Sequence, residues 1–255
     1  PSGTGTQVEI ELEGRYLKGR QSIDEYLEQT AIANPHAEIT WVPPSGEETV
    51  FPRAMDELPP EATEIKPHPK GIELGTLIQM LERTQEKHLG GFLQREFCRV
   101  GPGKAKELAE GARLTTRTWT SAVHHEEAER LYESIQAARI TSPPTDCLVP
   151  IGSKALLAGL LKEVQAEFFA AATRPPAVYR GDPFQMEVAI AYGGQLPGEE
   201  PARVLRFANR VPLLYQQSAC CSFKAVVEAG WKNYGLSQPR GSLPVGPLVV
   251  MIHMA

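Results

Sequence analysis

Apolar and polar residues alternate near the start of the chain, and this pattern predicts a β-strand. In QVEIELEG, Val8, Ile10 and Leu12 alternate with three glutamates, so one face of the strand would pack and the other would contact water. A helix is expected next, because SIDE over residues 22–25 forms a capping box. Its expected inner face consists of Ile23, Tyr26, Leu27 and Ala31. AEITWV and TVFPRA, separated by PPSGEE, then predict a hairpin.

The segment DELPPEATEIKPHPKG predicts a linker. It has four prolines in sixteen residues, and each proline disfavours helix at the preceding residue. We therefore place a domain boundary near residue 60. The sequence that follows predicts a helical module of about four short helices with glycine-rich turns between them. The first of these helices has an apolar face made of Leu74, Leu77, Ile78 and Leu81.

The last part of the sequence predicts an α/β domain. A long helix with a wide apolar face is expected over residues 153–174, and strand-like alternation follows over residues 184–192. One or two strands, interrupted near Asn209 and Pro212, and another helix come next. The nearly continuous apolar run over residues 248–252 predicts a central strand buried on both faces. The order is close to βαββαβ, so we expect two layers.

Charge is distributed unevenly, which indicates separate modules rather than one uniform body. Residues 1–58 carry 4 Lys/Arg and 11 Asp/Glu, residues 59–139 carry 12 of each, and residues 140–255 carry 10 and 8. The net charge of −5 argues against a chain that coats nucleic acid over its whole surface. No apolar run approaches the roughly 20 residues that span a bilayer, so we expect no membrane association.

The four cysteines are expected to be small buried side chains. Cys98, Cys147, Cys220 and Cys221 form no CxxC pair, and adjacent cysteines rarely form a disulfide with each other. No histidine lies at metal-ligand spacing from any of them. Free thiols of this kind are typical of a reducing cytoplasm, which is the expected location.

The common motifs of nucleotide-binding and hydrolytic enzymes are missing from the sequence. It contains no GxxxxGK[ST], GxGxxG, HExxH or GxSxG, and no metal site is expected. The backbone of GTGT, residues 3–6, offers N–H groups to a phosphate, although Gly-Thr before a strand is equally typical of a strand entry. No set of nucleophile, base and orienting residue is recognisable, so we assign no catalytic residue.

The most basic stretch runs from residue 87 to residue 106. Its five cations outnumber its single acidic residue, Glu96, and they flank a glycine-rich turn whose backbone can also contact phosphate. Contact with DNA is one interpretation, and a solvated helix face is the other. The candidate DNA-binding residues are Lys87, Arg95, Arg99, Lys104 and Lys106.

Several long stretches of the sequence closely resemble the B subunit family of DNA topoisomerase VI. They are QTAIANPHAEITW, FPRAMDELPPEATEIKPHPKGIELGTL, FLQREFCRVG, SPPTDCLVPIG, AAATRPPAVYRGDPFQMEVAIAYGG and RFANRVPLLYQQSAC. They follow the family's order and cover nearly the whole chain.

The resemblance implies an α+β protein of three modules. Residues 1–58 would be the C-terminal part of a GHKL-type ATPase domain, with Gly5 and Thr6 in the place of a Gly-Thr pair that contacts ATP. Residues 59–139 would be a helix-two-turns-helix domain, and residues 140–255 an incomplete transducer domain of the ribosomal-protein-like α/β kind. Most ATP-contacting motifs of the family would precede residue 1, and a lysine that reaches the γ-phosphate would follow residue 255.

The resemblance also implies a function and partners. The full-length subunit would use ATP and Mg²⁺ to close two B subunits into a homodimer, within a heterotetramer that contains two A subunits. The A subunit would cut one DNA duplex so that another can pass, which implies double-stranded DNA as substrate and a nucleoid-associated location. We expect the chain itself to lack ATPase activity. Two alternatives stay open: a non-enzymatic DNA-binding or adaptor module, and a piece of a mismatch-repair-type ATPase, although such ATPases lack the helical module.

Overall fold

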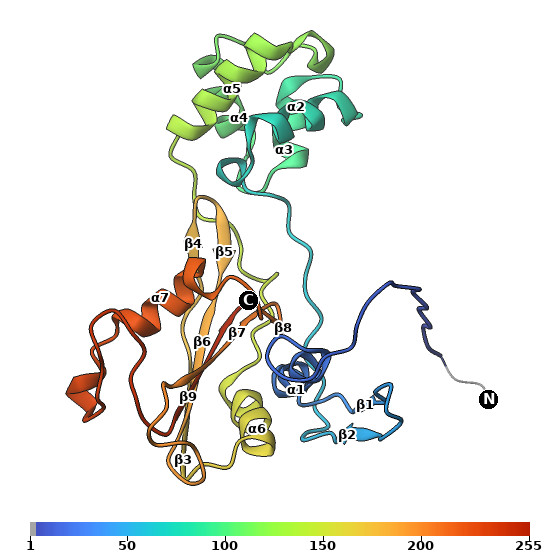
Figure 1. Cartoon of the computed structure of the whole chain (residues 1–255). Coiled ribbons are helices and arrows are strands. Elements are labelled where there is room, and N and C mark those ends of the chain that lie inside the picture. Colours follow the sequence, from blue (N-terminus) through green and yellow to red (C-terminus); the bar gives the residue numbers. More distant parts are fainter. Residues whose placement is uncertain (1–3) are drawn as a thin grey trace.

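The protein has a mixed α/β architecture of three units, as Figure 1 shows. The computed structural model describes residues 4–255. A small first unit contains α1, β1 and β2; a helical unit contains α2–α5; and a sheet unit contains α6 and all later elements. Extended segments connect the helical unit to the other two units (Figure 1). None of the helices within residues 4–255 combines the length and the apolar character needed to cross a bilayer.

The predicted strand near residue 8 is not formed, and this expectation was wrong. Residues 4–18 have no regular secondary structure, and Val8, Ile10 and Leu12 are 76%, 69% and 79% exposed. A β-strand needs a neighbouring strand to satisfy its backbone N–H and C=O groups. The alternating pattern shows which side chains would share a face, but among the described residues no strand pairs with this segment.

The first unit consists of one helix and one hairpin. Helix α1 spans Ile23–Ala33, and the Ser22 hydroxyl accepts a hydrogen bond from the Glu25 amide at 3.2 Å, as the capping box predicts. Strands β1 (Ile39–Trp41) and β2 (Thr49–Phe51) pair antiparallel, which confirms the predicted hairpin. The expected inner face of α1 was only partly right. Ile23 and Tyr26 are exposed, whereas the last turn, Ala31, Ile32 and Ala33, is fully buried.

The helical unit contains the four short helices that the sequence predicts. They are α2 (Leu74–Arg83), α3 (Leu89–Glu96), α4 (Pro102–Gly111) and α5 (His125–Ala137), with short 3₁₀ turns η1 (Pro69–Gly71) before them and η2 (Thr120–Ala122) before α5. Their apolar faces share one core, in which Phe92 and Phe97 pack edge to face with ring centroids 5.8 Å apart. The unit therefore has its own hydrophobic core.

The sheet unit is built on five strands in the order β3-β6-β9-β7-β8. The strands are β3 (Phe168–Thr173), β6 (Met186–Tyr192), β7 (Arg203–Ala208), β8 (Val211–Pro212) and β9 (Leu248–Met254). Strand β9 lies in the centre, antiparallel to β6 and parallel to β7, and six of its seven residues are buried. The sequence prediction of a central strand is therefore confirmed. A separate hairpin, β4 (Ala177–Tyr179) and β5 (Asp182–Phe184), extends towards the helical unit (Figure 1).

The sheet has helices on both faces, so the expected two layers are three. Helix α6 (Ser153–Glu163) packs on one face with Leu205 and Met251, and α7 (Cys221–Glu228) packs on the other with Val204 and Val250. Two 3₁₀ turns, η3 (Gln217–Ala219) and η4 (Trp231–Tyr234), flank α7. The helix expected over residues 153–174 was wrong beyond residue 163, because residues 168–173 pair antiparallel with β6. An apolar run alone does not show where a helix ends when a strand follows it closely.

Candidate functional site at the joint between the first unit and the sheet unit

The two residues predicted to contact ATP lie apart from every other candidate residue. Gly5 and Thr6 are exposed in the extended segment before α1, and a Cβ placed on Gly5 would meet open space. Gly3, the first residue of GTGT, falls outside the described part of the chain. Within residues 4–255 no three His, Cys, Asp or Glu side chains are placed to bind a metal ion. Contact of Gly5 and Thr6 with ATP stays a prediction.

The structure places all five candidate DNA-binding residues in the helical unit or its loops, and most of them have partners. Arg95 pairs with Glu86 at 2.6 Å, Lys104 with Glu107 at 2.6 Å, and Lys106 with Glu110 at 3.8 Å. The Nε of Arg99 donates to the Ser142 carbonyl at 2.9 Å. Lys87 is exposed and has no carboxylate within ion-pair distance among residues 4–255.

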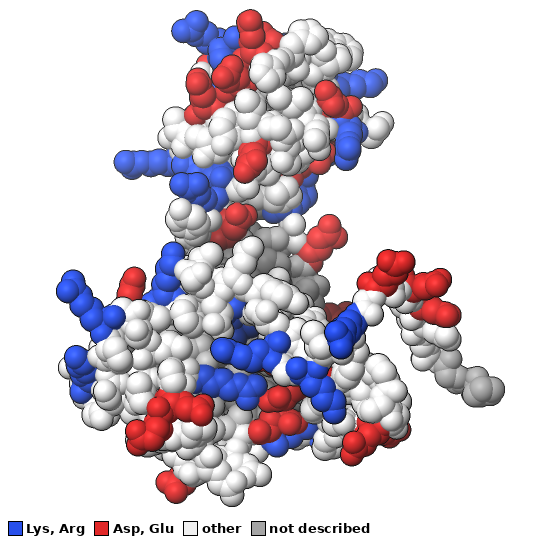
Figure 2. All heavy atoms as spheres, in the orientation of Figure 1, with Lys and Arg blue, Asp and Glu red and all other residues white. Residues whose placement is uncertain are grey.

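The glutamates in these pairs lie just outside the 87–106 window, so the local excess of positive charge is smaller in space than along the sequence. Figure 2 shows the result on one face of the helical unit, at the top of the view, where Lys/Arg and Asp/Glu side chains are interspersed. In each exposed ion pair, the carboxylate offsets the positive charge that would otherwise attract a phosphate backbone. DNA contact by these residues stays a prediction, and Lys87 is its best-placed candidate.

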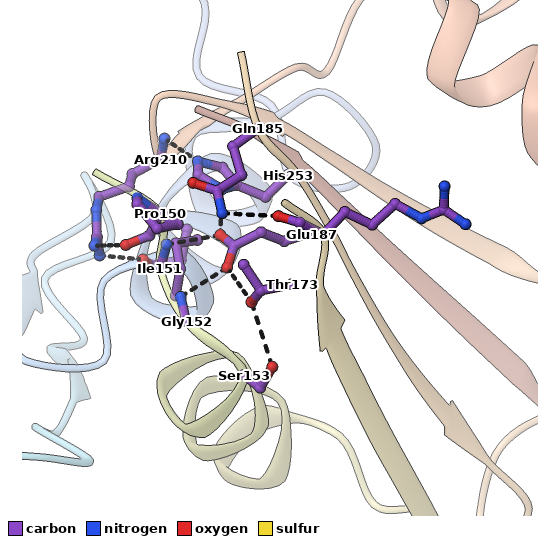
Figure 3. Close-up of polar contacts among 11 residues, drawn as sticks. Pro150, Ile151, Gly152, Ser153, Thr173, Gln185, Glu187, Arg210 and His253 are labelled. Atoms are coloured by element: carbon purple, nitrogen blue, oxygen red, sulfur yellow. Dashed lines mark hydrogen bonds and ion pairs between the residues drawn. The ribbon is translucent and has the colours of Figure 1, made fainter. Parts of the chain in front are cut away.

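A different set of polar residues is buried at the end of β9. Glu187 and His253 are both fully buried, and the Nδ1 of His253 lies 2.8 Å from a carboxylate oxygen of Glu187 (Figure 3). The same carboxylate accepts hydrogen bonds from the amides of Ile151 and Gly152 at 2.7 and 2.8 Å, and from the Thr173 hydroxyl at 2.7 Å. The carboxylate therefore has four donors, which come from β9, β3 and the loop before α6.

These donors keep Glu187 charged. Burial by itself raises the pKa of Glu187, but the hydrogen bonds from His253, Thr173 and the two backbone amides outweigh burial and hold the pKa below its usual value. The Nε2 of His253 accepts a hydrogen bond from the Arg210 amide at 3.1 Å. The histidine therefore carries its proton on Nδ1, which donates to Glu187.

A buried Glu–His pair resembles part of a catalytic set, but here both ring nitrogens are occupied. General-base catalysis needs a free imidazole nitrogen within reach of a substrate proton. The Nε2 of His253 is instead bound to backbone, and both side chains are inaccessible to a substrate. The arrangement holds backbone segments together and is not suited to proton transfer.

Arg210 extends this network to the first unit. Asn209 and Arg210 form the turn between β7 and β8, and both have positive φ angles, 47° and 66°, as a two-residue hairpin turn with left-handed residues requires. This turn directs the Arg210 guanidinium at two carbonyl groups. Its Nη1 donates to Ala33 at 3.3 Å and its Nη2 donates to Pro150 at 3.1 Å (Figure 3). Arg210 thus connects the C-terminal end of α1 to the loop that leads into α6.

The second contact between these units is a close approach of backbones. Gly159 lies on α6 against the last turn of α1, and a Cβ added to Gly159 would lie 2.0 Å from the carbonyl oxygen of Ile32. Ile32 is fully buried in the core that α6 shares with the sheet. We call the contacts of Arg210 and Gly159 with the last turn of α1 the α1 joint.

Two peripheral contacts support the α1 joint. The Nη2 of Arg203 on β7 lies 3.0 Å from a carboxylate oxygen of Glu28 on α1, and the amide of the Gln21 side chain donates to the Leu214 carbonyl at 3.1 Å. Both contacts line a groove of about 1260 Å³ between α1 and the sheet. Each is solvent-accessible and so contributes little. The α1 joint, in which Gly159 and Ile32 are buried and Arg210 is half-buried, is therefore the main connection.

Sequence reasoning missed most of this site. Glu187 alternates with apolar residues in β6, and that pattern predicts a solvent-facing side chain, whereas the residue is fully buried. The burial of His253 agrees with the apolar run around it. The expectation for the cysteines was wrong, since Cys98, Cys147 and Cys220 are partly exposed and Cys221 is exposed. The pairing of Glu187 with His253 had no signal in the sequence, because only the register of β6 and β9 places the two residues opposite each other.

Comparison with known proteins gives the site its context. A family described as "Topoisomerase VI B subunit, transducer" matches residues 143–255, which include α6 and the whole five-stranded sheet. Over 98% of its length the chain is 51% identical to the B subunit of type 2 DNA topoisomerase 6 from Methanosarcina barkeri, and it covers 41% of that protein. The corresponding protein of Archaeoglobus fulgidus is 44% identical over 99% of the chain, with 42% of its own length covered. That of Pyrococcus horikoshii is 34% identical over 98% of the chain, which spans 51% of it.

Proposed function

The chain belongs to the family of topoisomerase VI B subunits, and we propose that it is the coupling region of such a protein. It spans about two fifths of the length of the Methanosarcina relative. In this proposal the full-length subunit is the ATPase and transducer of a type IIB topoisomerase. The observation that carries the proposal is the α1 joint. It connects the unit that precedes the helical unit directly to the sheet unit that follows it.

The modular assignment is part of the proposal. We propose that residues 1–58 are the C-terminal part of a GHKL-type ATPase domain, residues 59–139 a helix-two-turns-helix domain, and residues 140–255 a transducer domain. One observation supports this division: the helical unit has a separate core. The last turn of α1 lies in the core of the sheet unit, which supports direct contact between the proposed ATPase and transducer parts.

The mechanism that follows is mechanical. A relay must resist deformation between its input and its output, and buried contacts with fixed geometry provide this resistance better than exposed ion pairs do. The α1 joint supplies one close backbone contact and one guanidinium hydrogen bond to Ala33, and a second guanidinium hydrogen bond holds Arg210 to Pro150 before α6. The Glu187–His253 pair fixes the turn that presents Arg210. A movement of α1 would therefore be transmitted to α6 and the sheet.

The partners of the full-length subunit are also proposals. They are a second B subunit, the A subunit and double-stranded DNA, in an assembly associated with the nucleoid. ATP and Mg²⁺ belong to the full-length subunit. Contact of Gly5 and Thr6 with ATP is part of the same proposal.

The experiment that tests the proposal combines a full-length form of the protein with the A subunit. We expect this mixture to relax supercoiled DNA in an ATP-dependent reaction, and we expect the 255-residue chain in place of the full-length form to give none. Absence of ATP-dependent relaxation by the full-length pair, together with tight DNA binding by the chain, would favour the non-enzymatic DNA-binding or adaptor module instead.

A further inference from the structure

The β4–β5 hairpin continues the β3–β6 strand pair out of the sheet and reaches the helical unit (Figure 1). At its base the Arg174 amide donates to the Met186 carbonyl at 2.9 Å, and the Gln185 side-chain amide donates to the Arg174 carbonyl at 2.8 Å. The backbone of Gln185 also exchanges two hydrogen bonds with Ala255, at 2.9 and 3.0 Å. We call residues 174–185 the β-arm, and these hydrogen bonds fix its base to the sheet.

The tip of the β-arm contacts the helical unit at backbone distance. Arg180 and Gly181 form its two-residue turn, with φ angles of 52° and 91°. A Cβ added to Gly181 would lie 2.6 Å from the amide nitrogen of Gly71 and 2.7 Å from the Nδ1 of His68. A Cβ added to Gly71 would lie 2.7 Å from a carboxylate oxygen of Asp182. The two glycines therefore face each other, and a side chain on Gly181 would displace the tip from η1.

His68 connects three segments at this contact. It is only 6% exposed, and its Nδ1 accepts a hydrogen bond from the Lys70 amide in η1 at 3.3 Å. Because Nδ1 accepts, Nε2 carries the proton, and it donates to the Thr141 carbonyl at 3.1 Å. Thr141 lies in the segment that leads from α5 to α6. The tip of the β-arm therefore packs against a turn that is itself bound to the segment returning to the sheet unit.

The β-arm adds a third connection to two extended segments. Residues 55–68 and 139–152 contain no helix or strand, and they meet where the Thr63 amide donates to the Asp146 carbonyl at 3.4 Å. Units with separate cores move relative to each other unless a further contact fixes them. We propose that the β-arm is a latch, which holds the helical unit in one orientation relative to the sheet unit and transmits a reorientation of the helical unit to β6.

The path from the β-arm into β6 is short, because the base of the β-arm directly precedes that strand. The second residue of β6 is Glu187, whose carboxylate accepts hydrogen bonds from the amides of Ile151 and Gly152. Glu187 also binds His253, which accepts a hydrogen bond from the Arg210 amide. A displacement of the β-arm therefore reaches the α1 joint along one continuous strand. This transmission step rests on the proposed function as a relay, whereas the latch itself does not.

The latch is tested by measuring the distance between two spin labels in the 255-residue chain. Glu129 on α5 and Glu228 on α7 are both exposed, and each is replaced by a labelled cysteine. The four native cysteines are replaced by serine in this background. Double electron–electron resonance gives the distribution of distances between the labels. We expect one narrow peak, because the latch holds the helical unit in one orientation.

Gly181→Ala is the variant that opens the latch, since its Cβ would overlap η1. Gly241→Ala is the matched control, because Gly241 also has a positive φ angle, 71°, but open space surrounds it. Both variants introduce the backbone strain of a left-handed alanine, and only Gly181→Ala also loses the contact. We expect a broad distance distribution for Gly181→Ala and the narrow peak for Gly241→Ala. If Gly181→Ala does not fold, Gly71→Leu fills the same contact from the helical unit and should give the broad distribution.

Transmission to β6 is tested by the hydrogen exchange of two amides, those of Ile151 and Gly152, measured by NMR in the chain with its native cysteines. Both amides donate to Glu187. Hydrogen exchange reports local opening of such hydrogen bonds. We expect the exchange of both amides to be several-fold faster in Gly181→Ala than in Gly241→Ala.

The outcomes separate the parts of the proposal. A broad distribution without any glycine substitution would overturn the latch, as would a narrow peak in Gly181→Ala or equal broadening in Gly241→Ala. A broad distribution in Gly181→Ala with unchanged amide exchange would overturn the transmission to β6. Absence of ATP-dependent relaxation by the full-length pair would alter neither measurement, so failure of the proposed function is distinguishable from failure of the latch.

Discussion

The α-carbon of Gly159 faces the carbonyl oxygen of Ile32 so closely that no larger residue fits between α6 and α1. An added Cβ would lie 2.0 Å from that oxygen, a distance at which one of the two backbones must move. Ile32 is itself fully buried, so the carbonyl group cannot turn towards solvent. The contact therefore fixes the distance between the first unit and the sheet unit at one point.

Gly159→Ala is expected to destabilise this contact strongly. Overpacking of a core costs about 1–3 kcal/mol, and the cost of a clash with backbone lies at or above the upper end of this range. We expect a decrease in Tm of about 5–10 °C, measured by differential scanning calorimetry. Gly75→Ala is the matched control, because Gly75 lies in α2 with open space around it. This control should raise stability by a few tenths of a kcal/mol to about 1 kcal/mol. Equal Tm values for both variants would contradict the packing described here.

Leu160 and Leu161 provide a second test of how α6 is oriented. Leu160 is fully buried between α6 and the sheet, and Leu161 is 59% exposed. An aspartate at position 160 would be buried without a partner, so Leu160→Asp is expected to abolish cooperative unfolding of the sheet unit. Leu161→Asp should change the free energy of unfolding by less than about 0.5 kcal/mol. Circular dichroism during urea denaturation distinguishes the two, and similar curves would mean that α6 is rotated from the orientation seen here.

Stability at acid pH is expected to depend on Glu187. Its pKa is below the usual value in the folded protein, so the charged form contributes stability that is fully present above the unfolded pKa of about 4.5. This contribution is lost as the pH falls through the folded pKa. Glu187→Gln should therefore reduce the free energy of unfolding by about 2–3 kcal/mol at pH 7, and the difference from wild type should shrink at strongly acidic pH.

Glu199→Gln is the control for this experiment, since Glu199 is exposed. Urea denaturation at several pH values gives the two free-energy profiles. A Glu187→Gln variant whose deficit is the same at pH 7 and well below the folded pKa would show that the charge of Glu187 makes no contribution.

DNA binding by the helical unit is expected to depend more on Lys87 than on its paired neighbours. Lys104 is held by Glu107 at 2.6 Å, whereas Lys87 is exposed without such a partner among the described residues. If the helical unit contacts a phosphate backbone, Lys87→Ala should lower the slope of log K against log salt concentration by about 1. Lys104→Ala should change the slope less. Fluorescence anisotropy with a short duplex gives both slopes, and unchanged slopes would support a solvated face.

The sequence predicts some parts of this structure much better than others. The helices of the helical unit follow from periodicity, because each buries one apolar face. The central position of β9 follows from its continuous apolar run, because both of its faces are buried. The end of α6 does not, because residues 164–173 stay mostly apolar while the structure changes from helix to strand. The α1 joint also could not be predicted, since Gly159 and Ile32 are far apart in the sequence and only the tertiary fold brings them together.

The coupling proposal is tested most directly in the full-length protein assembled with the A subunit. The quantity to measure is the number of strand-passage events per ATP hydrolysed, for the variant Arg210→Gln and for the control Arg240→Gln. Arg240 is exposed in a loop. Arg210→Gln removes the hydrogen bonds to Ala33 and Pro150. We predict that it keeps ATP hydrolysis but lowers this ratio several-fold, while Arg240→Gln keeps the wild-type ratio. A folded Arg210→Gln enzyme with an unchanged ratio would contradict the role of the α1 joint as a relay.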